Sequence, residues 1–191
     1  MTDVFDVLGK DHAEVKAMLE ALEAGPTAAG GASPEQLEQR KRLADQVIIE
    51  ESRHETAEQQ YFWPAVRALG AQGEQVADQA VRQEQQAAET LDRLGRASAD
   101  DQEFEKLLTG FIADAREHIS FEEEHAWPLL SAALSAAQAA DLGEKITKAK
   151  QSAPTRPHPH TPPDEKILKA AGPVVGAADK VRDAMSDRGT R

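Results

Sequence analysis

The chain has 191 residues, 40% of them hydrophobic, with 34 acidic against 22 basic residues and a formal net charge of −12. This charge disfavours nucleic acid and membrane surfaces as partners, and the absence of cysteine excludes disulfides, thiolate metal sites and thiol catalysis. The N-terminal segment lacks the long apolar run of a signal peptide and no later stretch is long and apolar enough to span a bilayer, so we expect a cytoplasmic protein.

Four long segments carry apolar residues at helical spacing, with glycine or proline between them. Ser33 followed by Pro34 has the form of a helix N-cap and first helical position. Strong helix formers dominate the composition, which leaves few candidates for strands. The expected helices cover about 4–24, 34–69, 75–96 and 101–137. We therefore predict an all-α fold, an antiparallel up-down four-helix bundle.

The sequence changes character after the fourth helix. We expect a short further helix over about 136–150, packed beside the fourth helix or extending it. Five prolines in residues 153–163 predict an extended tether. The remaining Ala/Lys/Asp-rich residues predict a partly helical or mobile tail. We therefore divide the chain into a bundle domain, 1–152, and a Pro-rich C-terminal tail, 153–191.

An internal repeat on the second and fourth helices carries the candidate chemistry. Residues 54–64 and 118–128 both read His-x3-Glu-x4-Trp-Pro. A His and a Glu four residues later lie one turn apart on one helix face, so each segment offers an imidazole and a carboxylate to one point. Two such helices face to face predict a two-metal site in which each glutamate bridges and each histidine binds one metal. The predicted ligands are His54, Glu58, His118 and Glu122.

The first and third helices also align with each other. His12 and Glu84 are each followed by apolar residues at offsets of three, seven and ten, so they occupy equivalent, core-facing places. Burying such a group costs free energy unless it is paired or binds a metal, and metal ligation explains both positions. For Glu84 an ordinary exposed, Gln-rich helix face remains the alternative.

This pattern of ligand positions resembles the hemerythrin-like, HHE cation-binding family over about residues 1–137. The resemblance implies that His12 and the two His-x3-Glu pairs bind two iron ions bridged by an oxo or hydroxo group. The family normally has a histidine on the third helix, where this chain has Glu84. We therefore expect three histidines and three carboxylates instead of the commoner four and two.

Three further residues of the repeat are expected around the ligands. Glu55, beside His54, is placed to supply a further oxygen, with surface charge as the alternative. Tyr61 and His125 each follow a ligand histidine by seven residues and are expected as hydrogen-bonding or gating groups, with packing at the bundle end as the alternative. The other repeat residues are interpreted as structural, with Glu123 and Glu124 as surface charge and Trp63 and Trp127 as core aromatics.

Imidazole and carboxylate ligands suit iron, manganese or zinc, and the resemblance favours iron. An anionic Glu84 in place of a neutral His stabilises ferric iron, which disfavours reversible oxygen carriage. We predict a non-heme di-iron protein that reacts with or binds dioxygen, peroxide or nitric oxide in oxidative-stress response or iron handling, with catalase-like or ferroxidase activity as candidate enzymatic roles. The alternatives are a non-catalytic metal- or oxygen-responsive module whose tail contacts a protein partner, and a metal-free helical interaction domain.

Overall fold

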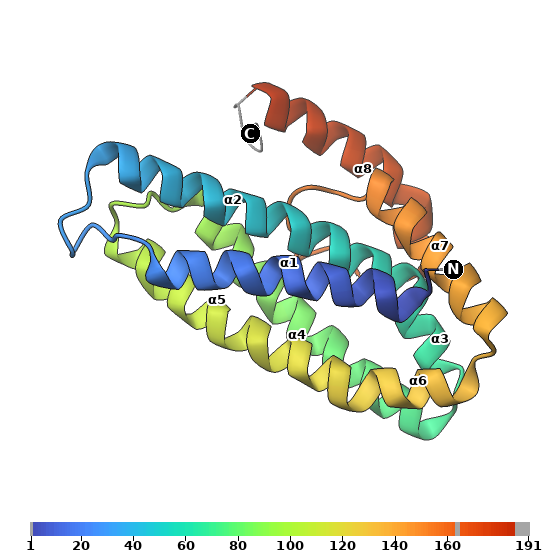
Figure 1. Cartoon of the computed structure of the whole chain (residues 1–191). Helices are drawn as coiled ribbons and strands as arrows, with labels where there is room; N and C mark the ends of the chain where they lie inside the picture. The colour runs from blue at the N-terminus through green and yellow to red at the C-terminus, as the bar shows by residue number, and fades with distance from the viewer. Residues whose placement is uncertain (1, 163–164, 186–191) are drawn as a thin grey trace.

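The structure is a computed structural model that describes residues 2–162 and 165–185. Helices make up its regular elements, and the described residues contain no strand. The elements are α1 (Val4–Ala24), α2 (Pro34–Ala57), η1 (Glu58–Phe62), α3 (Trp63–Arg67), α4 (Ala71–Arg96), α5 (Gln102–Phe121), η2 (Glu122–Ala126), α6 (Trp127–Ala133), α7 (Ala136–Ser152) and α8 (Glu165–Met185). The helices α1, α2, α4 and α5 lie lengthwise beside one another (Figure 1), which confirms the predicted four-helix bundle.

Local capping chemistry sets the helix ends. The side chain of Asp3 accepts hydrogen bonds from the first turn of α1, and Ser33 and Ser135 cap α2 and α7 in the same way, each in a capping box. Gly70 has a φ of 91°, a left-handed conformation that glycine adopts without a side-chain clash, and it ends the second helical rod. The next helix begins at Ala71, four residues before the predicted start, because the turn at residues 68–70 is short.

The apolar core forms two clusters with a polar layer between them. One cluster contains Leu8 and the other contains Val15, and His12 lies between these two residues on α1. Each fully buried leucine or phenylalanine in the clusters contributes about 1.5–3 kcal/mol to folding. The same helices that build the two apolar clusters therefore hold the polar layer in place.

Four rods form the bundle: α1, the continuous run of α2, η1 and α3, then α4, and the continuous run of α5, η2 and α6. The second and fourth rods each contain a π-helical turn that the sequence did not predict. The turn η1 begins at Glu58 and η2 begins at Glu122, and each ends just before a Trp-Pro pair. After each turn, the backbone N–H of the tryptophan donates to the backbone carbonyl five residues earlier, Trp63 to Glu58 and Trp127 to Glu122. A π-turn holds one residue more than an α-turn and so rotates the side chains that follow it. Such turns occur frequently at functional sites.

The helix α7 does not pack beside the fourth rod or extend it, as the sequence predicted. It lies against α1 and α2 instead. Gly143 allows this contact, because a Cβ atom there would lie 2.8 Å from the backbone of Asp3. A helix without a side chain at this position can approach the N-terminus of α1 closely.

Residues 153–162, which we call the strap, loop back from α7 to α8 across the bundle (Figure 1). Residues 153–155 are buried, and the strap is tied to α8 by polar contacts. Asp183 accepts hydrogen bonds from Thr155 and Arg156 at 2.5 and 2.7 Å, and Asp179 lies 2.9 Å from His158. The expected extended tether is therefore docked where it is described, while residues 163–164 and 186–191 lie outside the described residues. The division at residue 153 remains a prediction.

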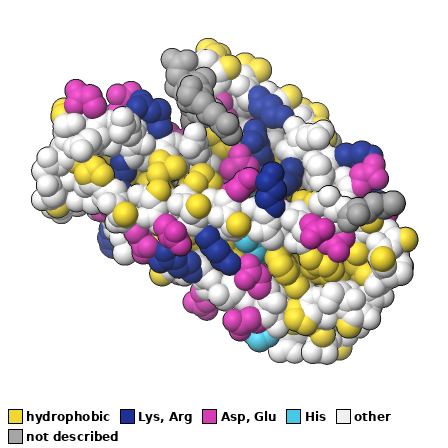
Figure 2. All heavy atoms as spheres, viewed as in Figure 1, with side chains coloured by type: hydrophobic (Ala, Val, Ile, Leu, Met, Phe, Trp, Pro, Cys, Tyr) yellow, Lys and Arg dark blue, Asp and Glu magenta, His cyan; other side chains and the backbone are white. Residues whose placement is uncertain are grey.

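Acidic and basic side chains are interspersed over the face of the molecule shown in Figure 2. Large exposed hydrophobic side chains gather on the outer face of α8: Ile167, Val174, Val181 and Met185. Within the part of the chain that the structure describes, no helix combines the length and hydropathy needed to span a membrane.

Candidate metal centre

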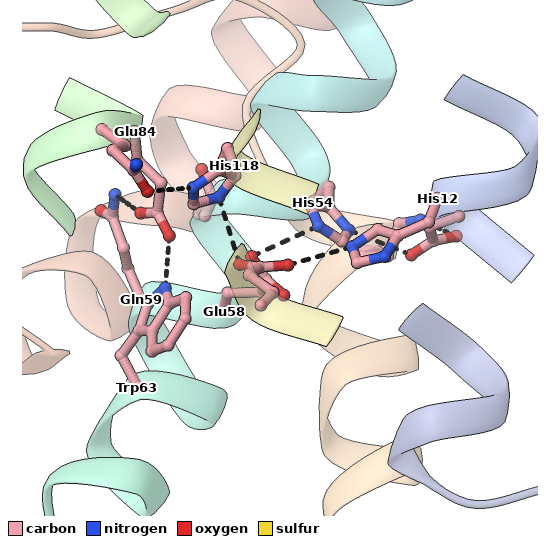
Figure 3. A network of polar contacts seen from close by, with 12 residues as sticks. His12, His54, Glu58, Gln59, Trp63, Glu84 and His118 are labelled. Atoms are coloured by element: carbon pink, nitrogen blue, oxygen red, sulfur yellow. Dashed lines mark hydrogen bonds and ion pairs between the residues drawn. The ribbon is translucent and has the colours of Figure 1, made fainter. Parts of the chain in front are cut away.

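The polar layer brings together all six predicted ligands from the four rods of the bundle. Their ligand atoms form two groups, and within each group the atoms lie within 4.8 Å of one another. The first group is His12, His54, Glu58 and Glu122, and the second is Glu58, Glu84, His118 and Glu122. Glu58 and Glu122 belong to both groups and are fully buried. In Figure 3 Glu58 lies between the His12/His54 side and the His118/Glu84 side.

The two shared carboxylates lie at the start of the π-turns. Glu58 and Glu122 are the first residues of η1 and η2, one helical turn after His54 and His118. His54 Nε2 lies 3.3 Å from Glu58, and His118 Nε2 lies 3.1 Å from Glu122. Each His-x3-Glu pair therefore presents its imidazole and its carboxylate to the same point, as the helical spacing predicted.

The three histidines are oriented by partners on their outer ring nitrogens. His12 Nδ1 lies 3.0 Å from Glu123, His54 Nδ1 lies 3.4 Å from Asp11, and His118 Nδ1 lies 3.1 Å from the side-chain oxygen of Gln83. A carboxylate or amide oxygen at Nδ1 favours the tautomer with the proton on that nitrogen, which leaves the lone pair of Nε2 facing the centre. This is the arrangement in which a histidine binds a metal.

The atoms that face the centre lack hydrogen-bond partners among the described residues. They are both carboxylate oxygens of Glu58, both of Glu122, and the Nε2 atoms of His12 and His118. The Nε2 atoms of His12 and His118 lie 3.0 and 3.1 Å from Glu122 oxygens, but without the alignment of a hydrogen bond. Buried polar atoms are nearly always paired, so six unpaired ones aimed at one point fit a bound cation.

The electrostatics of the centre also fit a cation. Burial raises the pKa of Glu58 well above its usual range, and the neighbouring Glu122 and Glu84 carboxylates raise it further. Burial alone would raise the pKa of Glu122, but His118 and His12 outweigh it and hold this pKa below the usual value. Burial likewise opposes protonation of His118, yet Glu122, Glu84 and Glu51 raise its pKa to about 9. Without metal, protons must neutralise this cluster.

Glu84 is buried, not on an exposed face, and two side chains hold its carboxylate (Figure 3). Gln59 Nε2 donates to one oxygen at 2.5 Å, and Trp63 Nε1 donates to the other. Burial raises the pKa of Glu84 to about 7, against the opposing influence of His118. The structure thus places the third-helix glutamate in the second group of candidate ligands.

The three residues expected around the ligands lie in different surroundings. Glu55 is buried, and burial together with Glu51 and Glu84 raises its pKa well above the usual value. The ammonium of Lys169 lies over the ring of Tyr61, with Nζ 4.1 Å from the ring centroid. The exposed His125 packs against Phe121. The extra residue of each π-turn rotates positions 61 and 125 away from the face of the preceding histidine. Their expected roles at the centre remain predictions.

Several residues beside the centre were not predicted from the sequence. Glu123 was interpreted as surface charge but lies against His12 and Lys16, and Trp63 is a core aromatic that also donates to Glu84. Asp11 and Gln83, which contact His54 and His118, each directly precede another candidate ligand in the sequence. This adjacency could have identified them. Glu51 is buried close enough to raise the pKa of His118, and its place one turn before Glu55 could have identified it.

A helical bundle with a buried His/Glu cluster defines a class of metal-binding proteins, and comparison with known proteins gives the family. The sequence pattern of the hemerythrin HHE cation binding domain matches residues 3–130, so the chain belongs to this family. Hemerythrin HHE domains bind metal ions, usually iron, and the cluster provides the corresponding side chains.

Two relatives extend the similarity beyond the family match. An uncharacterised hemerythrin-like protein of Schizosaccharomyces pombe is 25% identical over 186 residues, which cover 97% of this chain and 87% of that protein. The crystal structure of a hemerythrin HHE cation binding domain-containing protein from Mycobacterium kansasii has a TM-score of 0.64 at 21% identity, over 95% of this chain and 99% of that one. The second likeness shows the fold, and it reaches past the four rods into the C-terminal part of the chain.

Proposed function

We propose that this protein is a non-heme di-iron protein that reacts with peroxide, dioxygen or nitric oxide in oxidative-stress response or iron handling. The observation that carries the proposal is the pair of ligand groups that share Glu58 and Glu122. Two carboxylates common to two groups are what a pair of bridged metal ions requires. The expected cytoplasmic location is part of the same proposal.

The two proposed iron positions have equal numbers of side chains but different chemistry. His12 and His54 would hold one iron, His118 and Glu84 would hold the other, and Glu58 and Glu122 would bridge both. Bound iron would supply the redox chemistry with peroxide or dioxygen that no side chain of this cluster provides. The protein's part is to fix the ligands, exclude bulk water and hold protons on the outer ring nitrogens.

The Glu84 carboxylate supports reaction over reversible carriage. An anionic ligand in place of a neutral imidazole adds negative charge to one position and stabilises the ferric state. The test is to load the protein with ferrous iron and expose it to air and to hydrogen peroxide separately. We expect irreversible conversion to the ferric form, which the absorption spectrum of the protein would report. A stable oxygen adduct that reverses under vacuum would contradict this part of the proposal.

A non-catalytic, metal-responsive module is a second candidate, favoured by the exposed apolar face of α8. Val174 and Val181 are 72% and 61% exposed on this face, and an exposed apolar patch is a feature of interaction sites. If metal binding signals through α8, amide hydrogen exchange in α8 should differ between iron-loaded and metal-free protein. Equal exchange in the two forms would count against a sensing role.

A further inference from the structure

A cavity of about 70 Å³ lies beside the candidate metal centre, between the bundle and the C-terminal segments. Its floor consists of hydrogen-bonding side chains from α2, η1 and α4: Ser52, Glu55, Thr56, Gln59, Glu84 and Gln85. Its roof consists of the inner face of α8 and of strap residues that include three prolines and the polar side chains of Arg156, His158 and Thr161. One water molecule needs roughly 10–15 Å³ by this measure, so the cavity has room for several molecules of that size.

Glu84 connects this cavity to the centre. Its side chain lines the cavity and also belongs to the second ligand group, with Glu58, His118 and Glu122. Gln59, which donates to Glu84, lines the cavity as well. A small molecule in the cavity would therefore lie beside the same glutamate that is proposed to hold iron.

The floor contains the carboxyl group of Glu55. This residue is 7% exposed, and no hydrogen bond or ion pair to its side chain is present among the described residues. Ser52 and Thr56 both donate to backbone carbonyls of α2, which leaves their oxygens as acceptors. Such groups favour a ligand that both donates and accepts hydrogen bonds.

The roof is attached to the bundle by specific contacts. Gln85 donates to the carbonyl of Pro159 in the strap, and Gln60 donates to the carbonyl of Leu168 in α8 at 3.2 Å. Gly172 lets α8 approach, because a Cβ atom there would lie 3.1 Å from the Gln60 amide. The C-terminal segments are therefore a wall of this cavity.

We propose that this cavity is the pocket in which hydrogen peroxide binds before it reaches the centre, with the strap and α8 as its outer wall. The inference rests on the proposed function and narrows its substrate. Hydrogen peroxide is small and uncharged, and it donates and accepts hydrogen bonds, which suits the floor. Dioxygen and nitric oxide, in contrast, offer no hydrogen-bond donor to the Glu55 carboxyl group.

Filling the cavity tests the proposal. Ala171 lines it from α8, and the adjacent Ala170 is exposed, so Ala171→Phe and Ala170→Phe form a matched pair. In iron-loaded ferrous protein we expect Ala171→Phe to lower the second-order rate constant for oxidation by hydrogen peroxide at least tenfold, with unchanged iron content. Ala170→Phe should react like wild type. Ala88→Leu fills the cavity from α4 and should repeat the effect if Ala171→Phe fails to fold.

A second readout does not depend on reactivity. A high-resolution crystal structure of the wild type should show ordered solvent hydrogen-bonded to Glu55, and Ala171→Phe should displace it. The proposal of a peroxide pocket would be overturned if the wild-type cavity contains no solvent. It would also be overturned if both filled variants react at the wild-type rate. A wild-type protein that binds iron but does not react with peroxide would instead overturn the proposed peroxide reaction and the pocket with it.

Discussion

The indole N–H of Trp63 donates a hydrogen bond to Glu84, which joins an aromatic side chain of the apolar core to the carboxylate on the third helix of the bundle. Trp63 is 1% exposed and packs in the apolar cluster next to the centre. The side chain therefore stabilises the bundle and orients one candidate ligand.

Replacing Trp63 with phenylalanine should separate these two roles. Trp63→Phe keeps an aromatic ring but removes the donor, so Glu84 loses one of its two hydrogen bonds. Loss of such an outer partner weakens metal binding by about tenfold or more. Trp127→Phe is the control, because the Trp127 indole N–H has no hydrogen-bond partner among the described residues. Iron titration of both variants would reveal the difference, and equal affinities would contradict it.

Glu84 itself should matter for one metal position and not for both. Glu84 and His118 both belong only to the second ligand group, and His118 supplies the sole imidazole of that group. We expect Glu84→Ala to retain about half of the wild-type iron per chain or bind it more weakly, and His118→Ala to lose most of it. Elemental analysis of purified protein measures both. Full iron content in Glu84→Ala would show that this glutamate is not a ligand.

Glu123 should support His12 from outside the centre. Its carboxylate lies 3.0 Å from His12 Nδ1 and 2.9 Å from Lys16 Nζ. The substitution Glu123→Gln removes this charge and should lower iron affinity by about tenfold, because the imidazole of His12 would be less well oriented. Glu124→Gln is the matched control, because Glu124 is the exposed next residue. The same affinity in the two variants would argue against this role.

Stability of the metal-free protein should depend on pH in a defined direction. Glu84 and His118 have pKa values of about 7 and about 9, above their ordinary 4.5 and 6.5, so both bind more protons in the folded chain. Their stabilising contribution is complete below the ordinary pKa and is lost as pH rises through the folded pKa. Glu122, with a lowered pKa, acts in the opposite direction and loses its contribution as pH falls below about its ordinary 4.5.

Thermal denaturation between about pH 5 and pH 9 checks this expectation. The Tm of metal-free protein should be highest near pH 5–6 and fall by several degrees toward pH 9. Glu84→Gln should flatten the part of the curve that lies below about pH 7. Bound metal replaces the protons, so the increase in Tm on metal binding should be larger at high pH. A metal-free Tm that rises from about pH 6 to pH 9 would rule this explanation out.

The sequence predicted those features that depend on helical spacing. His54 and Glu58, and likewise His118 and Glu122, lie on one face because four residues make about one turn, and the capping residue Ser33 correctly predicted the start of α2. Apolar offsets also predicted that Glu84 faces the core. These features follow from local periodicity, which does not require knowledge of long-range packing.

Features that depend on packing or on altered helix geometry were not predictable in this way. The π-turns at Glu58 and Glu122 break the spacing that was expected to carry Tyr61 and His125 to the centre. The docking of α7 on α1 depends on a close approach at Gly143, and the docking of the strap depends on Asp179 and Asp183 in α8. Prolines predict that a segment is not helical, but not which surface it covers.

Anomalous diffraction at the iron edge, from crystals of iron-loaded protein, tests the central claim most directly. We expect two peaks about 3.5–4 Å apart, both within bonding distance of Glu58 and Glu122. One peak should adjoin His12 and His54, and the other should adjoin His118 and Glu84. A single peak, or none between Glu58 and Glu122 in fully loaded protein, would contradict the account.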